Sequence, residues 1–101
     1  MDDVTGEDRN PERDALLHRA LELATEYLDS LPDRPVPPRL RTDDLTSVFG
    51  GPTPQRGEDP LRVVEALAAG AEPGLSAHGS PRFFGFVIGG QYPVALAADW
   101  L

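Results

Sequence analysis

The sequence predicts a mainly α-helical chain, with three to four helices separated by long proline- and glycine-rich loops and one short strand at residues 82–88. The helices are predicted because a capping residue precedes a proline at Asn10-Pro11 and again at Asp59-Pro60, and apolar residues follow each pair at helical spacing. The loops are predicted because the 101 residues include 10 glycines and 11 prolines. A chain of this length forms one domain at most.

The first helix is predicted from Asn10 to about Leu31, after which Pro32 stops it. The charge-rich residues 1–9 before it are predicted to be a disordered tail. Apolar residues alternately four and three positions apart form one seam along this helix, and further apolar residues broaden it. The seam consists of Leu17, Leu21, Ala24, Leu28 and Leu31, and the broadening residues are Leu16, Ala20, Leu23 and Tyr27. A helix with this pattern is expected to dock on another apolar surface.

Three more helices and the strand are predicted in the rest of the chain. Residues 32–41 hold four prolines and are predicted to be an extended connector that does not pack. Thr42 is predicted to cap a short helix at 43–49 that ends at Gly50. A helix from Pro60 to about Ala69 is predicted to end at Gly70, and Pro93–Leu101 is predicted to begin a buried helix. The aromatic and β-branched residues at 82–88 favour the strand.

Composition excludes several classes of function. A net charge of −8 argues against binding to the nucleic-acid backbone, which requires clustered cations. The longest apolar run, FFGFVIGG, is too short to cross a membrane, and no secretory leader opens the chain. The chain has no cysteine, which excludes disulfides and thiolate metal sites, and a cytoplasmic location is expected. All nine basic residues are arginines, so no side chain can form a Schiff base.

Single residues give weak functional signals. His18 lies four residues after Asp14 and is predicted to form a solvated ion pair with it. His78 lies in a loop beside the aromatic run, where it is either structural or functional. Ser76 and Ser80 have no base adjacent in sequence, so the pattern does not identify a nucleophile. No histidine pair, glycine-rich phosphate loop or spaced carboxylate pair is present, and no metal site is predicted.

The last 22 residues, SPRFFGFVIGGQYPVALAADWL, carry a resemblance to a known family. They resemble the N-terminal region of the pyridoxal-phosphate-dependent group II amino-acid decarboxylases, a family that includes aromatic-L-amino-acid and glutamate decarboxylases. The shared order is a Ser-Pro, an aromatic pair, an apolar segment, a small-residue turn, a proline and an Ala-Asp-Trp-Leu ending. In this chain these are Ser80-Pro81, Phe83-Phe84, residues 86–88, Gly89-Gly90, Pro93 and residues 98–101. The order of elements from residue 14 onward also agrees.

The resemblance implies that residues 10–101 are the N-terminal helical segment of a longer decarboxylase, truncated before its cofactor-binding domain. The full-length family has the α/β fold-type-I architecture of pyridoxal-phosphate-dependent transferases. It acts on amino acids as a homodimer, to which the helix at about 11–31 contributes packing. The cofactor is pyridoxal phosphate, and its attachment lysine would lie beyond Leu101. This agrees with the lack of lysine here.

The resemblance also implies which residues border the substrate pocket. These are His78, Phe86, Val87, Ile88 and Gly89. None of them is expected to be catalytic or to hold the cofactor. The turn here is about one residue shorter than in the aromatic-acid members, and Gly79 and Ser80 stand where many members have histidine. The aromatic residues Phe83, Phe84, Phe86 and Trp100 are alternatively plain core residues.

Two other functions stay open at this point. In the first alternative, the longer protein is one of the aminotransferase-like members of the same family and transfers an amino group. In the second alternative, the chain is a small acidic helical interaction module that uses its first helix for docking. Residues 83–101 carry one charge, Asp99, and an apolar stretch of this kind is typical of an interface.

Overall fold

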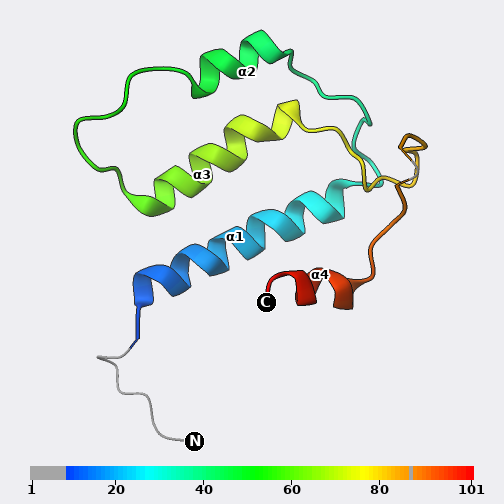
Figure 1. Cartoon of the computed structure of the whole chain (residues 1–101), viewed down its shortest axis with the longest axis horizontal. Coiled ribbons are helices and arrows are strands. Elements are labelled where there is room, and N and C mark those ends of the chain that lie inside the picture. Colours follow the sequence, from blue (N-terminus) through cyan, green and yellow to red (C-terminus); the bar gives the residue numbers. More distant parts are fainter. Residues whose placement is uncertain (1–8, 87) are drawn as a thin grey trace, which may run out of the picture.

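The computed structural model describes residues 9–86 and 88–101. Within these residues it has four α-helices and no strand, so the mainly helical fold predicted from the sequence is confirmed (Figure 1). The helices are α1 (Pro11–Ser30), α2 (Thr42–Phe49), α3 (Pro60–Ala71) and α4 (Pro93–Asp99), and a short 3₁₀ helix, η2 (Glu72–Gly74), follows α3 directly. Of the predicted tail, only Arg9 is described, and it is exposed.

The two longest helices begin as the cap-and-proline pattern predicts. The Asn10 side chain accepts a hydrogen bond from the Arg13 backbone N–H at 3.0 Å, and Asp59 accepts one from the Arg62 N–H at 3.3 Å. The predicted cap at Thr42 is wrong. Thr42 is the first helical residue of α2, and Arg41 precedes the helix without any side-chain cap.

The prediction that Gly70 ends α3 is also wrong, because α3 continues to Ala71 and then tightens into η2. Gly70 serves close packing instead. A Cβ atom at this position would lie 2.9 Å from a ring carbon of Phe49 and 2.9 Å from a methyl carbon of Val48. The missing side chain therefore lets α2 approach α3. From the sequence alone, a glycine with this role cannot be distinguished from one that ends a helix.

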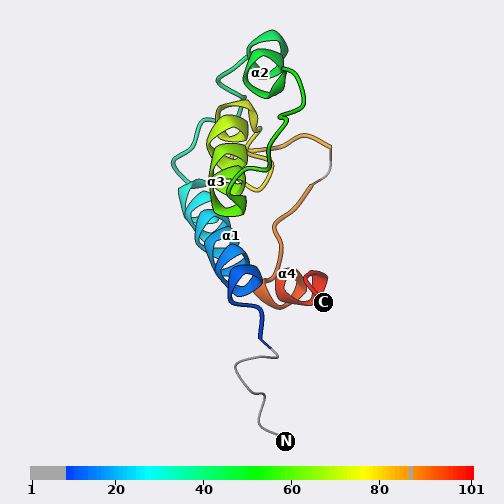
Figure 2. The same ribbon diagram turned by 90° about the vertical axis from the view of Figure 1, so that its left-hand side faces the viewer.

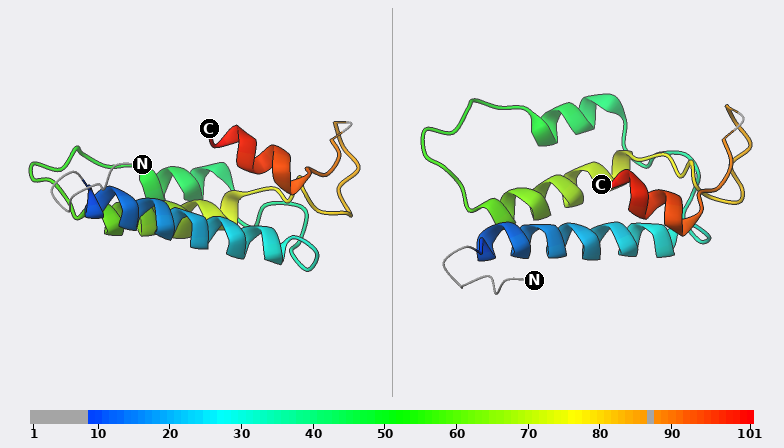
Figure 3. Two further views of the ribbon diagram at one scale, coloured as in Figure 1. Left: turned by 90° about the horizontal axis from the view of Figure 1, so that it is seen from below. Right: turned by 60° about the horizontal axis from the view of Figure 1, so that its bottom comes forward.

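Helices α1, α3 and α2 lie side by side in one layer, with α3 in the middle (Figure 1). The molecule measures 49 × 40 × 20 Å, and its shortest dimension is larger than the diameter of one helix. Figure 2 looks along the layer, and Figure 3 shows α4 lying outside it. A single layer leaves both of its faces open to solvent or to another molecule.

Helix α1 turns a different face to α3 from the one that the apolar seam predicts. The half-buried positions on this side of α1 include Leu16, Ala20, Leu23 and Tyr27, the residues that broaden the seam. Arg19 joins them and pairs with Glu65 of α3 at 3.1 Å. The seam residues Leu17, Leu21 and Leu28 remain exposed. We call Leu17, Leu21 and Leu28 the α1 stripe, and it lies about a third of a turn away from the α3 contact.

The best buried part of the chain lies where the segments after α1 and after α3 meet. Leu31, Ala77 and Ser80 are buried there. The Ala77 N–H donates to the Val36 carbonyl at 2.9 Å, and the Arg39 and Leu40 N–H groups donate to the Pro73 carbonyl at 2.6 and 3.0 Å. The proline-rich connector 32–41, predicted not to pack, therefore runs along residues 72–77 and is hydrogen-bonded to them.

Glu72 fastens this junction electrostatically. Its carboxylate accepts from Arg34 at 2.7 Å and also pairs with Arg39, so one acid holds two points of the connector. Partial burial raises the pKa of Glu72, but hydrogen bonds and charge from Arg39 and Arg34 outweigh this, and the pKa lies below its ordinary value. The Arg34 guanidinium also lies 4.8 Å over the ring of Tyr27, which ties the junction to α1.

The strand predicted at residues 82–88 is absent from the described residues of that segment. Residues 81–82 form a turn, and the Ile88 N–H donates back to the Gly85 carbonyl at 3.3 Å across a second turn. Phe86 has a φ of 58°, which is left-handed and incompatible with a strand. The physical reason is that a single strand is not stable without a partner strand, and the described chain offers none.

The prediction of a helix near the C-terminus is confirmed, but the prediction that it is buried is wrong. Every residue of α4 except Leu96 is exposed, and Trp100 after it is exposed as well. The α1–α3 pair has no second layer that could cover α4 (Figure 3). The apolar side chains of this segment therefore face solvent in the single chain.

We expect replacement of Glu72 by glutamine to destabilise the chain by about 1 kcal/mol at pH 7, a small value because the partly exposed carboxylate is screened by water. The folded-state pKa of Glu72 lies below 4.5, so its contribution is present above about pH 5 and is lost as pH falls through 4.5 and below. Urea unfolding followed by circular dichroism at pH 7 and pH 3.5 measures this. The variant should lose less stability on acidification than the wild type.

Glu58→Gln is the matched control, because Glu58 lies in an exposed loop and forms no ion pair within the described residues. Equal effects of the two substitutions at pH 7 would contradict the role given to Glu72.

Candidate functional site

The loop between η2 and α4 brings together three of the predicted pocket residues. His78, Ile88 and Gly89 line one hollow of about 360 Å³. Its other lining residues are Gly79, Ser80, Pro81, Phe83 and Gly90. The hollow forms because the turns at Ser80–Phe83 and Gly85–Ile88 fold this loop back on itself.

Aromatic contacts hold the wall of this hollow. The His78 and Phe83 rings meet edge to face, with centroids 5.1 Å apart and an angle of 77°. Phe83 in turn stacks on Phe86, with centroids 6.3 Å apart. Such pairs contribute about 0.5–1.5 kcal/mol beyond their buried area. The contacts orient the imidazole of His78 against an apolar surface while its own side chain stays open to solvent.

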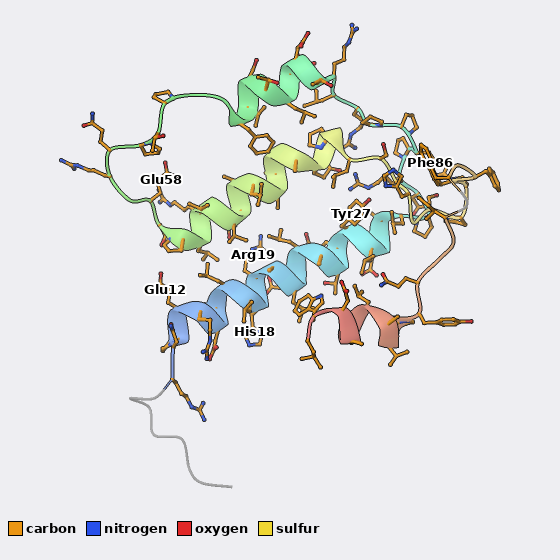
Figure 4. The ribbon with its side chains drawn as sticks, in the orientation of Figure 1. Glu12, His18, Arg19, Tyr27, Glu58 and Phe86 are labelled. Atoms are coloured by element: carbon orange, nitrogen blue, oxygen red, sulfur yellow. The ribbon has the colours of Figure 1, made fainter. Side chains whose placement is uncertain are left out.

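Phe86 lies outside the hollow rather than in its lining. Its backbone is left-handed and the residue is 84% exposed, at the far end of the loop in Figure 4. Left-handed backbone is costly for a bulky residue, by roughly 1–3 kcal/mol. Val87, the remaining predicted pocket residue, lies outside the described residues.

Three further residues line the hollow although the sequence did not predict them as pocket residues. Ser80 is buried, and its hydroxyl accepts a hydrogen bond from the Arg82 N–H at 3.1 Å. Phe83 was predicted to be part of the family motif or a core residue, and its ring contacts that of His78. Gly90, the second residue of the Gly89-Gly90 pair predicted to form a turn, also lines the hollow. No hydrogen bond joins Ser80 to His78 in the described structure, so the two do not form a nucleophile and base pair.

A second, larger hollow of about 800 Å³ runs between α1 and α3. Its apolar lining includes Leu23, Leu67 and Leu75, and its lining also holds two ion pairs, Arg19 with Glu65 and Arg34 with Glu72. In Figure 4, Arg19 and Tyr27 point from α1 toward α3. Because both arginines of this groove are paired with glutamates, the groove has the features of a packing surface rather than of a reactive centre.

The remaining sequence candidate, His18, does not form a reactive site in the described structure. His18 points away from α3 (Figure 4) and forms no ion pair in the described chain, since Asp14 pairs with Arg13 at 3.0 Å. The predicted His18–Asp14 pair is therefore wrong. Within residues 9–86 and 88–101, no three His, Asp or Glu side chains gather to hold a metal ion. No helix in that part of the chain is long and apolar enough to cross a membrane.

The residues of this chain do not fit the covalent attachment of pyridoxal phosphate. That attachment needs a side-chain amine that can lose its proton, and arginine is the only strong base in the sequence. What the hollow offers is a small apolar wall with one oriented imidazole.

Comparison of the chain with models of protein families gives no match, and comparisons with curated proteins and with solved structures give no significant match.

We expect Phe83→Ala to release the His78 ring. NMR spectroscopy of the histidine ring protons measures this, because loss of the neighbouring aromatic ring removes its ring-current shift from His78. The His78 signals should move toward random-coil positions, while those of His18 stay unchanged. Phe84→Ala is the matched control, because Phe84 is exposed and forms no aromatic contact within the described residues. An unchanged His78 signal in Phe83→Ala would contradict the edge-to-face contact.

Proposed function

We propose that this chain is the N-terminal segment of a pyridoxal-phosphate-dependent amino-acid decarboxylase and supplies part of the substrate-pocket wall and of a homodimer interface. The observation that carries the proposal is the hollow of the 78–90 loop. His78, Ile88 and Gly89 are far enough apart in sequence to need a folded loop to meet, and they line one hollow. The family resemblance names the same three residues.

In this proposal the wall binds and orients the amino-acid side chain, and the chemistry lies elsewhere in the longer protein. Apolar atoms of Phe83 and Ile88 would exclude water from one side of the substrate. The His78 imidazole, held by Phe83, would donate or accept one hydrogen bond at the rim. When bound, pyridoxal phosphate supplies the electron sink for loss of the carboxylate.

The α1 stripe supports the homodimer part of the proposal. Leu17, Leu21 and Leu28 remain exposed although α1 already packs on α3 through another face. An exposed leucine row on a helix of 20 residues is suited to pair with the same row of a second subunit. The same observation favours the second candidate, an interaction module that docks another protein on α1.

The activity is tested by reading the coding sequence past Leu101 and expressing whatever follows in frame. We expect several hundred further codons that include a lysine for the cofactor. The longer protein, supplied with pyridoxal phosphate, should release carbon dioxide from an amino acid. Transfer of the amino group to a keto acid without carbon dioxide release would identify the aminotransferase alternative. A stop codon directly after Leu101 would overturn the enzyme proposal and leave the interaction module.

In the active longer protein, we expect His78→Ala to lower kcat/KM by at least about tenfold, since it removes one hydrogen bond to the substrate and part of the wall. His18→Ala is the matched control, because His18 is exposed on α1 away from the hollow. Steady-state kinetics of the two variants measures the difference. Equal activity of both variants would remove His78 from the pocket.

The dimer is tested in the same longer protein with Leu17→Glu combined with Leu21→Glu. Two buried charges facing their own copies across a symmetric interface should convert the dimer to a monomer in sedimentation velocity experiments. Ala15→Glu is the control, because Ala15 is exposed on the polar side of α1. A dimer that survives the double substitution does not use the α1 stripe.

A further inference from the structure

The segment from Phe84 to Trp100 is an apolar arm that the rest of the chain does not cover. Its described residues, 84–86 and 88–100, include Phe84 at 91% exposure, Tyr92 at 82%, Val94 at 76% and Trp100 at 56%. In Figures 2 and 3, α4 lies outside the layer of α1, α3 and α2. A run of large exposed apolar side chains along one stretch of chain is typical of an interaction surface.

The arm carries little charge, because Asp99, next to Trp100, is its one charged residue. The chain has a net charge of −8, so two copies repel each other over most of their surface. Acidic residues accompany the other apolar faces: Asp43 and Asp44 lie on α2 with Val48, and Glu65 lies on α3 with Leu67. Residues 83–98 carry no charge at all. A second copy therefore meets the least repulsion at the arm.

The area of the arm is close to what a weak dimer needs. An aromatic side chain can bury about 150–250 Å², so Phe84, Tyr92 and Trp100 at their exposed fractions offer about 450 Å² per copy. Val94 and the neighbouring alanines of α4 add to this. Stable complexes bury about 800 Å² per partner, and weak or transient ones less than about 600 Å².

We propose that the arm is a self-association surface through which two copies of this chain form a weak, symmetric dimer. Phe84, Tyr92, Val94 and Trp100 would form its apolar centre. The predicted pocket residues His78, Ile88 and Gly89 are not needed for it. This interface is separate from the α1 stripe of the proposed decarboxylase dimer, and it concerns the 101-residue chain itself.

Sedimentation velocity of the 101-residue chain over a concentration series tests the proposal, with Val94→Asp as the disrupting variant. An aspartate in the first turn of α4 suits the positive end of the helix, so the helix is retained. Across a symmetric interface, however, the two aspartates repel each other. We expect the wild type to dimerise with a Kd of about micromolar, and Val94→Asp to raise that Kd at least about tenfold.

Val63→Asp is the matched control, because Val63 is an exposed valine in the early part of α3, outside the arm. Its Kd should equal that of the wild type. Trp100 is the only tryptophan, so its fluorescence reports the arm directly. Dilution of the wild type should shift its emission to longer wavelength as the dimer separates, and Val94→Asp should show the shifted emission at every concentration.

Two results would overturn the proposal. A wild-type chain that stays monomeric into the hundreds of micromolar would show that the arm awaits a different partner. A dimer that survives Val94→Asp but is lost in Leu17→Glu with Leu21→Glu would place self-association on the α1 stripe. That second result would favour the dimer of the proposed function while removing the arm interface, so the two proposals fail separately.

Discussion

The arrangement of this chain depends on Glu72, which pairs at once with Arg34 and Arg39. The acid stands at the end of α3, and both arginines belong to the connector that leaves α1. These pairs, together with backbone bonds from the connector to Pro73 and Ala77, fix where α1 ends relative to α3. Arg34 also lies over Tyr27 of α1, so one partly screened ionic group joins three segments that are far apart in sequence.

Because the buried core is small, ion pairs and helix caps contribute a large share of the interactions that position the helices. Leu31 and Ala77 are the buried apolar residues of the described chain, and Ser80 lies with them. A single layer of helices has no second layer to enclose side chains, so burial contributes little at each contact. Helix caps, the Glu72 pairs and close approach at Gly70 then position the elements. The apolar surface left over is found on the α1 stripe and on the C-terminal arm, and both proposals of an interface start from it.

The candidate hollow is formed by turns that the sequence patterns did not specify. The resemblance named His78, Phe86, Val87, Ile88 and Gly89. Of these, His78, Ile88 and Gly89 line one hollow, Phe86 lies outside its lining, and Val87 lies outside the described residues. Phe86 is exposed and has a left-handed backbone, a conformation that no residue pattern predicts for a phenylalanine. Phe83 became the contact of His78 only when the Ser80–Phe83 turn closed. The spacing of apolar residues predicts single helices. A site in a loop depends instead on the turns of that loop and on the segments that pack against it.

The sequence by itself determined that the chain is helical and where α1 and α3 begin, because capping residues, prolines and apolar spacing act within a few residues of one another. Asn10, Asp59 and the two prolines after them sufficed for α1 and α3. Only the tertiary structure decided which face of α1 is covered, that Gly70 allows a close helix contact, and that the described residues of 82–88 form no strand. Each of these depends on a partner distant in the chain: α3 for α1, Phe49 for Gly70, and for residues 82–88 a neighbouring strand that the described chain lacks.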